Sequence, residues 1–200
     1  YSLVRSHFAY KAKLRKEALK EEVNSTVSKL RKATDTREAL ALFREHSREE
    51  LQSDLDFTAE VFGKAVNGFM NENLRELRKV LTAVEEKKIH LKQVKRVGTL
   101  GVTQLDHDIA VEKGLYYYQG NDFASEIIFS IRRLAEPMKD HIDNNFSPLS
   151  PVQKDDFGKV SEQIISFLRN CATMIRKNDY IGFEELIAES ITLMNQLTAL

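Results

Sequence analysis

Apolar residues recur at helical spacing over most of the chain, and the pattern is strongest in residues 115–149. Large apolar side chains follow one another there in steps of four and three: Phe123, Ile127, Ile131, Leu134 and Met138. This spacing places them on one face of an α-helix, so we expect the face to pack against a partner. Four apolar residues beside this face widen it, which predicts contact with a second helix: Ala124, Ile128, Ala135 and Ile142.

The end of this helix is predicted by residues that interrupt helical structure. Pro137 removes a backbone donor, so we expect it to kink or divide the helix. Asp143, Asn144 and Asn145 follow the last apolar position and should close the helix. Pro148 then prevents its continuation.

The first half of the chain predicts several helices separated by capping residues. We expect a first helix over residues 2–33. Asp35, followed three residues later by glutamate, predicts a helix start, and this short helix should end near His46. Ser47 and Glu50 form a capping-box pattern, which predicts a second helix start at that point.

The middle and the end of the chain continue the helical pattern. Gly98 to Gly101 weakens a helix that begins near Asn73, so we expect a bend, two helices meeting there, or a close approach of two helix backbones. Ser150, with proline next and glutamine three residues on, predicts another start. The last helix is expected from Tyr180 to about Thr198, with these side chains buried: Phe183, Leu186, Ile187, Met194 and Leu197.

Composition agrees with an all-α antiparallel bundle of about six long helices, forming a single domain over residues 1–200. Apolar residues make up 42% of the chain and there are only 3 Pro and 8 Gly. Lys+Arg and Asp+Glu both number 30, and this balance argues against a nucleic-acid partner. The single Cys171 suits a reducing compartment, and its apolar neighbours predict that it is buried.

Residues Glu126–Ser150, EIIFSIRRLAEPMKDHIDNNFSPLS, carry a resemblance to a known family. They resemble the second half of PhoU-like domains that are appended to bacterial phosphate transporters of the sodium/phosphate cotransporter and PiT-type families. In those domains a long helix leads through a proline into a His-hydrophobic-Asp-Asn-Asn corner, and a short connector and another helix follow. Here the corner is His141 to Asn145, and the wider similarity covers roughly Asn71 to Leu200.

The resemblance implies a function and a location. It implies a cytoplasmic regulatory domain that modulates phosphate uptake at the cytoplasmic face of the inner membrane. Its partner would be the transmembrane part of the same transporter, so its own contact with the membrane would be indirect. No run of about 20 apolar residues occurs, and we expect the membrane part outside this sequence. We also expect that the domain pairs as a homodimer.

Two groups of residues are candidates for a site, and no motif for a nucleophile or a phosphate loop occurs, so we expect no enzyme. Asp122 and Glu126 lie four apart on one helix face and could ligate iron or zinc. The family resemblance weakens this reading, because PhoU proteins carry the order Glu/Asp-x-x-x-Asp. The second group is a contact corner of His141, Asp143, Asn144 and Asn145, which could equally be a purely structural helix end.

Two other functions remain open at this point. One is a free-standing, metal-binding PhoU-like adaptor that regulates phosphate transport and signalling. The other is a structural helical protein with no link to a transporter. The metal content of the purified protein distinguishes the first, and the effect of corner substitutions on phosphate uptake distinguishes the second.

Overall fold

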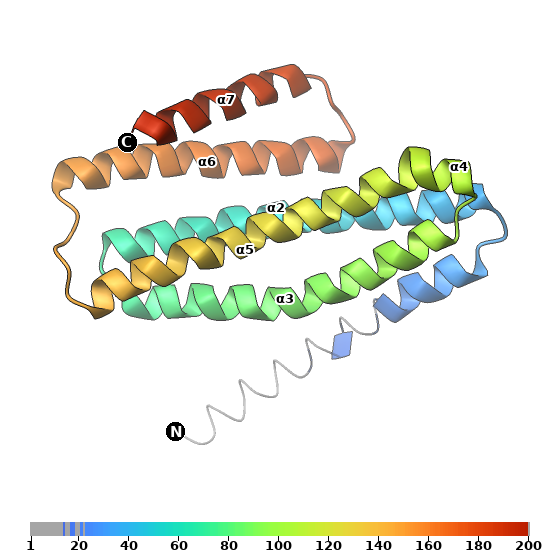
Figure 1. Cartoon of the computed structure of the whole chain (residues 1–200), viewed down its shortest axis with the longest axis horizontal. Coiled ribbons are helices and arrows are strands. Elements are labelled where there is room, and N and C mark those ends of the chain that lie inside the picture. Colours follow the sequence, from blue (N-terminus) through green and yellow to red (C-terminus); the bar gives the residue numbers. More distant parts are fainter. Residues whose placement is uncertain (1–13, 15–16, 19–20, 22, 200) are drawn as a thin grey trace. The chain divides into compact units, whose positions relative to one another are not determined.

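The computed structural model describes residues 14, 17–18, 21 and 23–199, and these residues form helices and connecting turns without any strand. The predicted all-α bundle is confirmed (Figure 1). Part of the predicted first helix lies outside the described residues, but 23–32 are helical. The remaining elements are α2 Thr36–Met70, α3 Leu74–Thr103, α4 His107–Ile109, a π-helical turn Ala110–Gly114, α5 Leu115–Asp143, α6 Pro151–Lys177 and α7 Phe183–Ala199.

The chain folds into two compact units. Unit 1 consists of Tyr1–Ser47 and Ile89–Gln119, and unit 2 consists of Arg48–Lys88 and Gly120–Leu200. Each unit therefore combines a segment of the first half of the chain with a segment that follows much later.

Helix α2 begins where the sequence predicts, but it does not break at Ser47. Asp35 accepts a hydrogen bond from the Glu38 N–H at 2.9 Å, and the Glu38 carboxylate accepts one from the Thr34 N–H at 2.8 Å. The predicted second start is wrong, because α2 is continuous and Ser47 is buried within it. No glycine or proline lies near this serine, so nothing in the backbone stops the helix there.

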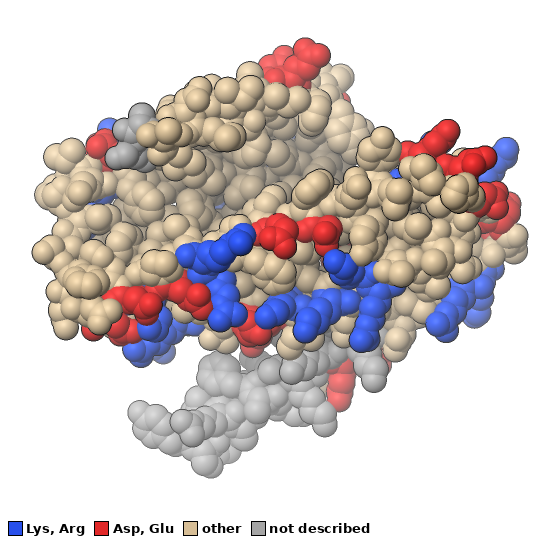
Figure 2. Space-filling model, viewed as in Figure 1, with Lys and Arg blue, Asp and Glu red and all other residues tan. Residues whose placement is uncertain are grey.

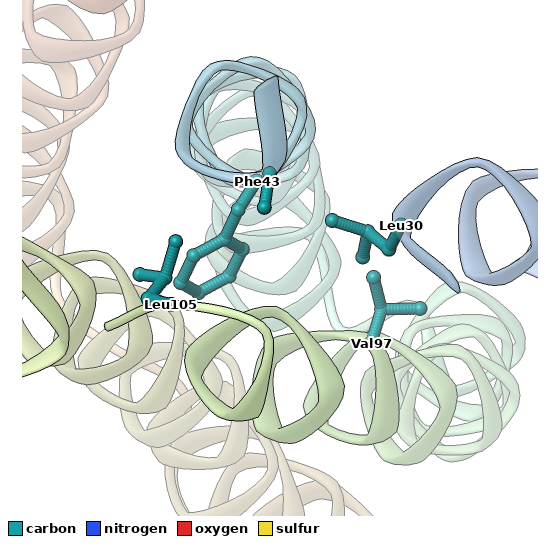
Figure 3. Packing of buried hydrophobic residues seen from close by; sticks show 5 residues of the cluster. Leu30, Phe43, Val97 and Leu105 are labelled. Atoms are coloured by element: carbon teal, nitrogen blue, oxygen red, sulfur yellow. The ribbon is translucent and has the colours of Figure 1, made fainter. Parts of the chain in front are cut away.

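The core of unit 1 is made of apolar side chains: Leu30, Ala39, Phe43, Val97 and Leu105. In Figure 3 the Phe43 ring lies between α2 and α3, with Leu105 beside it. A Cβ atom on Gly101 would stand 2.6 Å from the Phe43 ring, so the glycine makes room for this side chain of α2. The expected meeting of two helices at Gly98–Gly101 is wrong, since α3 continues to Thr103 and the break falls at residues 104–106.

In unit 2, helices α2 and α6 pack through a cluster of Leu55, Ala59, Leu168 and Ala172. Cys171 borders this cluster and is half-buried. Burial raises the pKa of its thiol above the usual range, with a smaller contribution from the charge of Glu189. The predicted burial of this cysteine is therefore only partial, although its surroundings are apolar.

Helix α5 buries only part of the predicted stripe, together with the smaller residues that were expected to widen it. Its buried side chains within unit 2 are Asn121, Ala124, Ile128, Ile131, Ala135 and Met138. Phe123 is 68% exposed and Ile127 is 40% exposed, so their predicted burial is wrong. The buried face thus includes small alanines, while the larger Phe123 and Ile127 beside them are left exposed. Pro137 lies inside α5 without dividing it.

Helices α6 and α7 lie side by side and are joined by a short turn (Figure 1). Ser150 forms the predicted capping box with Gln153, with bonds of 3.3 and 2.9 Å. Asn178 ends α6 in the left-handed conformation. Helix α7 begins at Phe183 rather than Tyr180, and only Leu193 along it is fully buried. The predicted burial of four other side chains is wrong: Phe183, Ile187, Met194 and Leu197 are all exposed.

Candidate contact site at the end of α5

The predicted contact corner begins with a hydrogen-bonded end of α5. The Asn145 N–H donates to the Ile142 carbonyl at 3.0 Å, and the Phe146 N–H donates to the His141 carbonyl at 3.1 Å. This pair of bonds is a Schellman motif, in which a left-handed residue reverses the chain. Asn145 supplies that residue with φ of 54°, and α5 ends at Asp143, in the polar corner that the sequence predicted.

His141 is held by contacts on both sides of its ring. Its Nε2 atom lies 2.9 Å from the carbonyl oxygen of Ser147. The Phe69 ring of α2 meets it edge to face at 5.3 Å between centroids, and Phe146 does so at 5.4 Å. The imidazole therefore contacts both the connector after α5 and the end of α2 within unit 2.

Asp143 is the charged centre of the corner. Lys139 Nζ lies 2.5 Å from one of its oxygens, and an Arg78 nitrogen of α3 lies 3.4 Å from the other. The hydrogen bond from Lys139, followed by the charges of both cations, holds the pKa of the Asp143 carboxyl below its ordinary value. The same contact raises the pKa of Lys139.

The two asparagines complete the corner at the surface. Asn144 donates from its side chain to the Asp140 carbonyl at 2.7 Å, and both Asn144 and Asn145 are exposed. The structure thus brings all four predicted corner residues to one helix end. Such an arrangement offers positioned amide and carboxylate groups for contact with another surface, and it contains no nucleophile paired with a base.

The predicted metal pair lies elsewhere on α5. Asp122 and Glu126 are both exposed, and a Glu126 oxygen lies 3.8 Å from an Arg133 nitrogen. Among the described residues, the side chains that could jointly hold an ion include neither of them. The iron or zinc site at this pair stays a prediction, and the nearby guanidinium weakens it because it competes for the same carboxylate.

A buried charged pair in unit 2 was missed by the sequence analysis. Asp54 of α2 is fully buried, and Lys87 Nζ of α3 lies 2.6 Å from its Oδ1 atom, with the lysine side chain only 11% exposed. Glu50, one turn before Asp54, is also buried, and carboxylate oxygens of the two lie within 4.8 Å of one another. The Lys87 ammonium lies 5.7 Å from the centre of the Phe57 ring.

One sequence signal could have indicated this pair. Asp54 lies four residues before Thr58, on a seam of apolar residues at helical spacing between Leu51 and Phe69, and the Thr58 hydroxyl donates to the Asp54 carbonyl at 2.7 Å. A carboxylate on such a seam predicts a buried counter-charge. Lys87 gave no comparable signal, because it lies in the run Glu85–Lys88, which is typical of a solvated face.

Comparison with known proteins identifies no relative of this chain. No protein-family model, curated protein or solved structure matches the chain. Within the described residues, none of the helices combines the length and the apolar character needed to span a bilayer. The resemblance carried by residues 126–150 therefore remains the basis for a functional hypothesis.

Proposed function

We propose that this chain is a non-catalytic regulatory domain of a bacterial inorganic phosphate transporter. It lies at the cytoplasmic face of the inner membrane and acts on the transmembrane part of the same transporter through contacts between helices. Phosphate uptake is modulated when these contacts rearrange.

The observation that carries the proposal is the sequence of Glu126–Ser150 with its helix, corner and connector. The fold supports it, because α5, the corner and α6 follow one another in the order of the PhoU-like pattern. The corner is also suited to transmit a displacement, since His141 and Asp143 tie the end of α5 to α2 and α3 within unit 2.

A matched pair of substitutions tests the proposal in the native protein in its own cells. Asp143→Asn removes the corner carboxylate, whereas Asp155→Asn removes a carboxylate of α6 outside the corner. Each carboxylate is bound by a lysine four residues away at 2.5 Å, so both changes remove the same kind of local ion pair, and only Asp143 also faces an arginine of α3. We expect Asp143→Asn to change the rate of labelled phosphate uptake several-fold, and Asp155→Asn to leave it unchanged.

The same cells provide the controls. Immunoblotting of membrane and soluble fractions should place the native polypeptide in the membrane fraction at equal levels for all variants. Equal uptake rates for Asp143→Asn and the wild type would contradict the proposal. A soluble product near the 23.0 kDa of this chain would also contradict it, and iron or zinc retained by that product would favour the metal-binding adaptor.

A further inference from the structure

Helix α7 in unit 2 has two apolar faces, and α6 covers only one of them. Leu193 is buried at the face that packs on α6. The other face carries four exposed apolar side chains and one half-buried serine at spacings of four, three, four and three residues: Phe183, Ile187, Ser190, Met194 and Leu197. This spacing is the seam of a two-stranded coiled coil, which is narrower than the stripe of a helix buried in a globular core.

The exposed face is large enough for a specific protein interface. Phe183 is 54% exposed, Ile187 46% and Met194 67%, while Ile191 beside the seam is 55% exposed. With Tyr180 and Ile181 in the preceding turn, six large apolar side chains, each 46–88% exposed, are available to a partner, and a standard interface takes ~800 Å² from each side. Monomeric proteins rarely leave such a contiguous apolar surface uncovered.

The charges on α7 restrict what can cover this face. The helix carries Glu184, Glu185 and Glu189 and has no lysine or arginine. Figure 2 shows a largely uncharged surface along α7, with acidic side chains gathered at the end where the helix begins. An acidic membrane surface would repel this helix, because binding to anionic lipid depends on lysine and arginine.

A second copy of the same helix satisfies these conditions in one orientation. In an antiparallel pair the acidic first turn of each α7 meets the uncharged last turn of the other, and the helix dipoles are opposed. A parallel pair would place the two acidic ends together. In the antiparallel coiled-coil register, Phe183 of one copy lies opposite Met194 of the other, and Ile187 lies opposite Ser190.

We propose that the outward face of α7 joins two copies of this chain as an antiparallel helix pair. Together with α6 of each copy, the paired helices form a four-helix bundle. This inference rests on α7 alone and does not depend on the proposed role in phosphate transport.

Sedimentation analysis of the purified 200-residue chain at micromolar concentration tests the pairing. We expect the wild type to sediment with twice the mass of the 23.0 kDa chain. Ile187→Asp combined with Met194→Asp should give a folded monomer. The matched control is Val152→Asp, which places the same charge on a 70% exposed apolar residue of α6 and should leave the dimer intact. A monomeric wild type, or a dimer that survives the double substitution, would overturn the proposal.

Cysteine cross-linking in a Cys171→Ser background tests the orientation without removing the interface. Phe183→Cys and Met194→Cys are prepared as separate variants and oxidised with copper phenanthroline. We expect a covalent dimer when the two are mixed and little from either alone, because residues 11 apart on a helix are separated by about 16 Å. Cross-linking of each variant with itself would show a parallel pair and reject the antiparallel arrangement.

Discussion

The two units stabilise their interiors in different ways. Unit 1 packs apolar side chains so closely that a ring lies against a glycine, as Phe43 does against Gly101. Unit 2 has an apolar cluster as well, but it also buries the ion pair of Asp54 and Lys87 and the side chain of Asn121. The apolar cluster of unit 1 depends on shape, whereas the interior of unit 2 depends on charge balance in addition.

This difference indicates where the chain departs from what stability alone favours. Removing two charges from water costs several kcal/mol per ion, and their attraction in the interior seldom exceeds that cost by much. The apolar cluster of unit 1 contains no charged side chain, so it does not incur this cost. The buried pair in unit 2 therefore restricts how α2 and α3 can be arranged, because any displacement would separate a carboxylate from its ammonium.

The largest expected effect comes from breaking this pair at one residue. Lys87→Met leaves the buried Asp54 carboxylate without the lysine ammonium, and it should lower the free energy of unfolding by about 3–5 kcal/mol. Urea denaturation followed by circular dichroism measures this loss. A change below ~1 kcal/mol would show that Lys87 is not a principal counter-charge.

The double variant sharpens the result. Asp54→Leu with Lys87→Met removes both charges, and it should recover most of the stability lost by the single change, since apolar replacement of a buried pair is often neutral or stabilising. A double variant as unstable as the single one would mean that the other contacts of Asp54 carry the stability. The comparison of single and double variants follows the logic of a double-mutant cycle.

Close packing in unit 1 predicts the next largest effect. Gly101→Ala places a Cβ atom 2.6 Å from the Phe43 ring, so the ring must move, at an expected cost of about 1–3 kcal/mol. Gly120→Ala in unit 2 is the matched control, because the nearest atom to its Cβ would be 3.8 Å away. That change should stabilise the protein by roughly 0.5–1 kcal/mol through helix propensity. Thermal denaturation of both variants distinguishes the signs, and a stabilising Gly101→Ala would contradict the packing.

The sequence predicted the helical architecture and those features that depend on neighbouring residues. The cap at Ser150 and the end of α5 at its polar corner were predicted correctly, because each involves atoms only a few residues apart. Ser47 shows the limit of this reasoning. The same serine-to-glutamate spacing occurs inside α2, where preceding carbonyls already bind the backbone N–H groups.

Features that depend on distant segments were not predictable from spacing. Helical periodicity shows that a face is apolar, but it does not show which neighbour covers it, so Phe123 and Met194 were wrongly expected to be buried. The pair of Asp54 and Lys87 joins residues 33 positions apart along two helices. The contact corner was identified as a group, whereas its attachments to Phe69 and Arg78 come from other helices of unit 2.

A smaller effect is expected at the left-handed residue of the corner. Asn145→Ala should lower the free energy of unfolding by about 0.5–1 kcal/mol, and Asn145→Gly should raise it by a few tenths to ~1 kcal/mol. Asn178 has φ of 50° at the end of α6 and provides a matched position with no role in the corner. Equal stability of the alanine and glycine variants would show that the corner relaxes out of the left-handed conformation.

The smallest effect is the pH dependence of stability that comes from Asp143. The ion pairs of this carboxylate lie at the surface, in contrast to the buried pair of Asp54 and Lys87. Because Lys139 and Arg78 lower the pKa of Asp143 in the folded state, its contribution to stability is fully present above the unfolded pKa of about 3.9. It is lost as the pH falls through the lower folded value. Asp143→Asn should therefore be less stable than the wild type at pH 7, and the difference should disappear in strong acid.

Urea denaturation of both proteins at pH 7, 5, 4 and 3 measures this difference in stability. Salt at 0.5 M should shrink the difference at pH 7, since screening weakens exposed pairs. A difference that stays constant across this range would mean that the Asp143 carboxylate stabilises the corner through something other than its charge.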